Sequence, residues 1–179
     1  AVINSLTKVN GSPLSGNEST IRVMLNISSP PASGVETIQI TPANAYAICN
    51  YDGNRLSVSE CTVNLTLIDR LVPTINDVNI IADSIVTITS SEDMYNNVGA
   101  TGAVSTNHFQ ATVYLNNGNA SEATIVNITN DNQGPLVGGE KIVRIGFVTD
   151  LSPSGVEEMT ISPAGPANPI YDPANNQMP

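Results

Sequence analysis

The chain has 179 residues and a formal net charge of −10, with only six Lys and Arg residues against sixteen Asp and Glu. This balance excludes the basic footprint of a nucleic-acid-binding protein, and an anionic membrane surface would repel the chain. No apolar run approaches the roughly 18 residues of a spanning helix, so we expect no membrane insertion.

An internal repeat organises the chain. Residues 13–43 return as 135–164 with an offset of 122, which falls to 121 after Pro31 because Ala32 has no counterpart. Of the 30 aligned pairs, 13 are identical. A period of this length has the size of a whole domain. We therefore expect residues 1–72 to be the back part of one repeat and residues 73–179 to be a second repeat without its last strand.

Short segments of alternating apolar and polar residues follow one another along the chain, which is the period of half-buried strands. In the first repeat, the alternation predicts strands at 21–27, 37–41 and 61–67. In the second repeat, it predicts strands at 76–82, 84–90, 109–115, 123–128, 141–148 and 156–162. No segment of ten or more residues shows the helical period, so the predicted fold class is all-β, built of antiparallel β-sandwich units.

Two groups of residues carry a resemblance to a known family. One is Thr87–Asn97 followed by Gly102-Ala103-Val104 and Phe109, and the other is Tyr51–Asn54 with Val63–Ile75. Together they resemble the immunoglobulin-like or cadherin-like repeats of large secreted and cell-surface adhesins. The resemblance spans nearly the whole chain and implies tandem immunoglobulin-like sandwiches in an extracellular location. Its motifs mark strands and turns and no active site. Within the repeat, Tyr51-Asp52 aligns with Tyr171-Asp172.

Cys49 and Cys61 are the only cysteines. In a secreted β-domain, a disulfide between them is expected, and closing a loop of this size would stabilise the fold by roughly 3 kcal/mol. The alternative is two unpaired thiols in a reducing compartment. Their spacing excludes a CxxC metal or redox site.

Six Asn-X-Ser/Thr sequons are candidates for glycosylation, and several would arise by chance in a chain so rich in these residues. Their acceptors are Asn10, Asn17, Asn26, Asn64, Asn119 and Asn127.

Acidic loops offer the oxygen ligands that calcium prefers. The candidates are Asp69 with Asp77 across the junction of the repeats, and the adjacent pair Glu92 and Asp93. The alternative is that these carboxylates are solvated turn residues. Apart from calcium, no cofactor is implied.

Catalytic constellations are not apparent in the sequence. His108 is the sole histidine and is expected in a turn before Phe109, without the cysteine or histidine partners of a zinc site. Glu157 and Glu158 are expected on opposite faces of one strand, which is unsuited to paired acid–base chemistry. We therefore expect that the chain is not an enzyme.

The expected function is that of a structural module of an extracellular surface protein, either an adhesin stalk or a filament building block. The alternative is a carbohydrate- or protein-binding β-sandwich domain of a secreted protein. Because the chain is cut out of phase with its repeat, we expect a strand from outside residues 1–179 beside 21–27 or 143–148. That strand would come from an adjacent repeat of a longer chain or from another copy of the chain, as in strand exchange.

Overall fold

The computed structural model describes residues 1–59 and 64–179, and its regular structure is almost entirely β. These residues divide into two compact units, Ala1–Leu71 (unit 1) and Val72–Pro179 (unit 2), and each is described by itself. The single helical turn described is the 3-10 segment Thr106–His108. Among the described residues, no helix combines the length and apolar character that crossing a bilayer requires.

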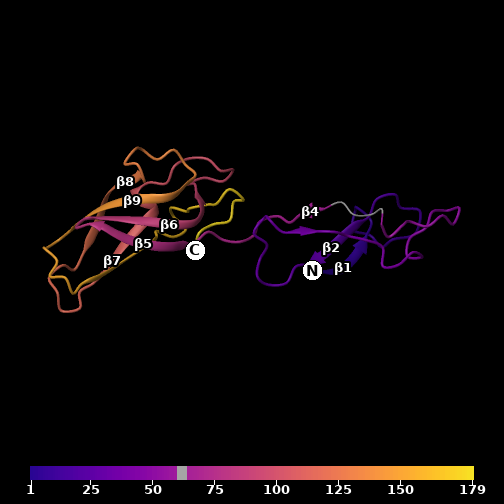
Figure 1. The fold of residues 1–179 in the computed structure, drawn as a ribbon, viewed down its shortest axis with the longest axis horizontal. Helices are drawn as coiled ribbons and strands as arrows, with labels where there is room; N and C mark the ends of the chain where they lie inside the picture. The colour runs from indigo at the N-terminus through magenta and orange to yellow at the C-terminus, as the bar shows by residue number, and fades with distance from the viewer. Residues whose placement is uncertain (60–63) are drawn as a thin grey trace. The chain divides into compact units, whose positions relative to one another are not determined.

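Unit 2 contains a four-stranded antiparallel sheet in the order β5-β6-β9-β8 (Figure 1). Its strands are β5 (Ile75–Ala82), β6 (Ile85–Met94), β9 (Glu140–Thr149) and β8 (Ala123–Asn130). A second, two-stranded antiparallel sheet pairs β7 (Phe109–Tyr114) with β10 (Glu158–Pro163). The predicted alternations at 76–162 therefore all lie on strands, with ends shifted by a few residues.

The core of unit 2 joins side chains from both sheets. Val86 and Ile88 of β6 and Val143 and Ile145 of β9 are at most 1 % exposed. They share one cluster with Phe109 of β7 and with side chains of β10 and of the C-terminal segment. Two sheets that contribute alternate residues to one core are consistent with a β-sandwich.

The described residues of unit 1 form two pairs of antiparallel strands. β1 (Val2–Thr7) pairs with β2 (Arg22–Asn26), and β3 (Thr37–Ile38) pairs with β4 (Leu65–Thr66). The last two are shorter than the predicted 37–41 and 61–67, of which residues 60–63 lie outside the described part of the chain. In unit 2, β7 pairs along six residues of β10, whereas β3 has only β4 beside it among the described strands. A strand with one short neighbour has fewer ladder bonds to keep it extended.

The two units share strand register as well as sequence. Thr7 pairs with Arg22 as Thr129 pairs with Arg144, and Leu6 pairs with Val23 as Ile128 pairs with Ile145. Every β1–β2 pair maps onto a β8–β9 pair by adding 122, and the bulge between Ile3 and Ser5 returns between Ile125 and Asn127. The repeated sequence therefore has the same backbone pairing in both places.

A second match corrects the alignment of the chain's later loops. The backbone N–H of Leu56 donates to the Ile48 carbonyl (3.0 Å), as that of Met178 donates to Ile170 (2.8 Å). The bridge Cys49–Arg55 likewise returns as Tyr171–Gln177. These pairs again differ by 122, so the counterpart of Asp172 is Asn50. The sequence alignment of Asp52 with Asp172 was wrong by two residues, because the shared Tyr-Asp dipeptide outweighed the register.

Candidate functional site

A groove of about 1010 Å³ runs between the two strand pairs of unit 1. Val23, Leu25 and Ile27 line it from the β2 side, and Ile38, Leu65 and Leu67 line it from the β3–β4 side. The walls are therefore mainly aliphatic, because the strand alternation that turns apolar side chains inward operates here as in unit 2. Such a surface favours an apolar or amphipathic occupant over a charged one.

Equivalent residues are covered in unit 2 and exposed in unit 1. Ile21 is 40 % exposed and its counterpart Val143 is fully buried. Ile48 is 46 % exposed, whereas Ile170 is 1 % exposed. Within the described residues, the core-facing side of unit 1 thus has the composition of a sandwich core without the matching cover.

The difference arises at the outer edge of β2, the edge that faces away from β1, because no described strand pairs with it. β9 lies between β8 and β6, whereas β2 pairs with β1 alone among the described strands. The expectation of an additional strand therefore does not apply to 143–148, where both edges are already paired. At 21–27, one edge stands open in the described structure.

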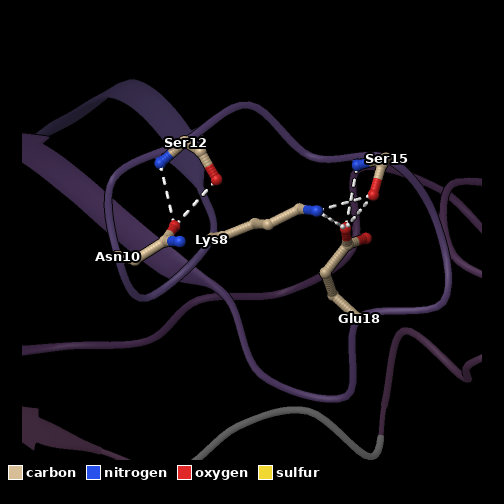
Figure 2. A network of polar contacts seen from close by, with 5 residues as sticks. All are labelled: Lys8, Asn10, Ser12, Ser15 and Glu18. Atoms are coloured by element: carbon tan, nitrogen blue, oxygen red, sulfur yellow. Dashed lines mark hydrogen bonds and ion pairs between the residues drawn. The ribbon is translucent and has the colours of Figure 1, made fainter.

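Carboxylates fix the turns that lead into the paired strands, and Figure 2 shows one of them, that of Glu18. Glu18 accepts hydrogen bonds from the backbone N–H of Ser15 (2.8 Å) and from its hydroxyl (3.0 Å), and lies 3.4 Å from Lys8 Nζ. The Ser15 backbone bond is the main cause that lowers the pKa of Glu18 to about 2. In unit 2, Glu140 accepts the Val137 N–H (2.7 Å) in the same way, again 122 residues later.

A second carboxylate turn follows the same rule. The Ser33 N–H donates to Glu36 (2.9 Å) as the Ser154 N–H donates to Glu157 (2.9 Å). In unit 2, the same Glu157 also accepts the backbone N–H groups of Asn119 (2.6 Å) and Ala120 (3.1 Å). These donors, Ser154 first, hold the pKa of Glu157 well below its usual range. Glu157 thus precedes β10 and joins two loops, so its expected place on a strand face was wrong.

His108 ends the 3-10 turn immediately before β7, as the sequence predicted. The residue is 9 % exposed, and its Nδ1 accepts a hydrogen bond from the backbone N–H of Ser105 (3.0 Å between the nitrogens). Burial lowers the pKa of His108. A neutral ring held by its own turn positions the start of β7 and has the geometry of a structural residue.

The four candidate calcium ligands are divided between the units: Asp69 belongs to unit 1 and Asp77, Glu92 and Asp93 belong to unit 2. Within unit 2, a carboxylate oxygen of Glu92 lies within 4.8 Å of one of Asp172. Asp172 is fully buried, and Asn176 donates to it from the backbone and from the side chain, each at 2.8 Å. Two carboxylates supply only part of the six to eight oxygens that calcium takes, so calcium binding stays a prediction.

Cys49 is exposed and lies in the bridge opposite Arg55. Its predicted disulfide partner Cys61 lies outside the described residues, so the disulfide stays a prediction.

All six sequon asparagines are exposed: Asn10, Asn17, Asn26, Asn64, Asn119 and Asn127. Their accessibility is a requirement for glycosylation that the structure meets, while the modification itself stays a prediction.

Sequence reasoning missed β1, the strand that pairs with β2. Its bulge places Ile3 and Leu6 three residues apart, which breaks the alternation used to find strands. Extending the repeat towards the N-terminus would have found it, since Ile3 matches Ile125 in the predicted strand 123–128 and Thr7 matches Thr129 immediately after it.

Comparison of the chain with protein-family models, with curated proteins and with solved structures found no match.

Proposed function

We propose that this chain is a structural module of an extracellular surface protein, serving as an adhesin stalk or a filament building block made of tandem immunoglobulin-like sandwiches. The observation that carries the proposal is the equal strand register of β1–β2 and β8–β9 at a constant offset of 122 residues. Repetition of a packed unit extends a protein in one direction and needs no reactive side chains.

Strands at matched positions of the repeat, taken from the two units, make up the strand set that we propose for one complete repeat. β3 is the counterpart of the start of β10 and pairs with β4. The Ala164 N–H donates to the His108 carbonyl (2.8 Å), so every second residue counted back from Ala164 turns its backbone N–H and carbonyl groups towards β7. Met159, the counterpart of Ile38, has the other parity, and its backbone groups point to the opposite edge of β10. A complete repeat would therefore add a β4-type strand to the sheet of β7 and β10.

Exposed side chains on β5 support this arrangement. Val78 and Ile80 pair with Ile88 and Val86, so they lie on the core face of the sheet. They are nevertheless 40 % and 78 % exposed. A β4-type strand beside β10 would lie across from them and cover them, as expected for modules whose sandwiches are completed by neighbouring repeats.

A glycan array combined with a calcium titration tests the proposed role. For a structural module, we expect no glycan binding at micromolar concentration. A rise in its melting temperature on addition of calcium would mean that the ion stabilises the folded repeats. Saturable binding of a glycan would instead establish a ligand-binding domain and refute the structural role.

A further inference from the structure

We propose that the outer edge of β2 and the groove beside it form an acceptor site for a β-strand with the alternation of β6, donated by another repeat module of this kind. The inference deepens the proposed function and rests on it, because modules built on this repeat carry such a donor strand.

Unit 2 shows what covers the equivalent edge. β6 pairs with β9 so that Val86 faces Ile145 and Ile88 faces Val143. All four side chains are buried in the core. Subtracting 122 from the β9 residues places the donor's Val86 position opposite Val23 and its Ile88 position opposite Ile21. These are residues of the half-exposed face of unit 1, so one strand in this register would cover it.

The backbone of β2 presents its hydrogen-bonding groups in the required direction. In unit 2, the Phe147 N–H donates to the Ser84 carbonyl (3.0 Å) at the start of the β6 edge. In an antiparallel strand, every second residue directs its backbone N–H and carbonyl groups to the same neighbouring strand. Those of Val143 and Ile145 therefore point towards β6 as well. Their counterparts Ile21, Val23 and Leu25 therefore turn their N–H and carbonyl groups to the open edge of β2.

Two further anchor points extend the site beyond β2. The Gly139 N–H donates to the Met94 carbonyl (2.9 Å), and Tyr95 and Tyr171 exchange backbone bonds of 2.9 and 2.8 Å. The counterpart of Gly139 is Asn17, which keeps the left-handed conformation (φ 65° against 88°). The counterpart of Tyr171 is Cys49, in a bridge of the same register. A donor of about twelve residues, Ser84–Tyr95 in the pattern of unit 2, would reach all of these points.

The chemistry of the site selects the donor. Its inward positions must be apolar and β-branched, as Val86 and Ile88 are, because they enter an aliphatic groove where an unpaired carboxylate would be costly. Its outward positions are polar, as Thr87 is, and Thr87 would lie opposite Arg22. A strand of the opposite parity would place threonine in the groove and leave its apolar side chains in water.

The test uses the full chain and a synthetic peptide with the sequence of Ser84–Tyr95. We expect saturable binding and a slowing of amide hydrogen exchange at Ile21, Val23 and Leu25 by about tenfold or more. Amides of Arg22 and Met24, which turn towards β1, should change less. This alternation distinguishes strand addition from general adsorption of the peptide, which would not follow the parity of β2.

Matched variants make the outcome decisive. An Ile88→Asp peptide should not bind, and a Val23→Asp chain should lose binding of the unmodified peptide, while Arg22→Asp should retain it. Exchange at Val143 and Ile145 reports in each case that unit 2 remains folded.

Two results would overturn the inference: no protection of Ile21, Val23 and Leu25 at saturating peptide, or equal protection by the Ile88→Asp peptide. Neither result bears on glycan binding, so failure of the acceptor site and failure of the structural role are distinguishable.

Discussion

Truncating one core position in each repeat probes the difference between the units directly. Ile145 and Val23 are counterparts at an offset of 122, and both turn inward from the middle of their strands. Ile145 is fully buried on β9, which has β6 and β8 on its two sides, whereas Val23 is partly buried and borders the groove. From the side chains alone, Ile145→Ala would cost only about 0.8 kcal/mol more than Val23→Ala, because it removes one additional carbon. The structure predicts a larger difference.

The expected magnitudes follow from burial. Truncating a fully buried Ile to Ala lowers the free energy of unfolding by about 2–5 kcal/mol, because a cavity remains in addition to the lost transfer energy. Val23→Ala removes two carbons worth about 0.8 kcal/mol each when fully buried, and at the partly buried Val23 the loss is about 1–1.5 kcal/mol in total. The groove is already open, so no new enclosed cavity is expected there.

Native-state hydrogen exchange with peptide-level mass spectrometry reports the free energy of opening of each unit separately. We expect the large loss in peptides of unit 2 for Ile145→Ala and the small loss in peptides of unit 1 for Val23→Ala. Equal losses at the two positions would refute the reasoning, since they would mean that the inner face of β2 is as well covered as that of β9.

Three further predictions concern the turns and the cysteines. Glu157→Gln should lower the melting temperature of the chain, because a neutral amide replaces the carboxylate that accepts the N–H groups of two loops; Glu158→Gln, at the exposed neighbouring position, should leave it unchanged. Chemical denaturation at a series of pH values should show that stability falls on acidification in two stages. The first stage lies below about pH 6.5, because burial lowers the pKa of His108 and protonation then favours the unfolded chain. The second lies between about pH 4.5 and 2, because the folded pKa of Glu18 is about 2. Material produced by secretion should show a mass about 2 Da lower than the dithiol form if Cys49 and Cys61 are joined, and quantitative alkylation of both thiols in that material would contradict the disulfide.

Much of the fold could be predicted because it depends on local alternation. Val143, Ile145 and Phe147 alternate with polar or small residues, and the structure places them in the core of an antiparallel sheet. Repetition of that pattern at Ile21 and Val23 located the second copy without any knowledge of contacts. All-β architecture followed from these short periods, and the absence of a helical period was matched by a single 3-10 turn in the described chain.

The parts that sequence could not supply depend on contacts between distant segments. Glu157 looks like a strand residue, yet Asn119 and Ala120 donate to it from a loop nearly forty positions earlier, and those bonds hold it in a turn. Ile21 has the same alternation as Val143, but only the sheet order shows that one is covered and the other is exposed. Burial is a property of the neighbours, which the local pattern does not encode.

Amide hydrogen exchange of the unmodified chain, measured residue by residue by NMR, tests the open edge of β2 most directly. The account predicts that Ile21, Val23 and Leu25 exchange at least about a hundredfold faster than Val143, Ile145 and Phe147, whose amides turn towards β6. Equally slow exchange in the two sets, in a chain that remains monomeric, would contradict it, because β2 would then have a partner on both edges.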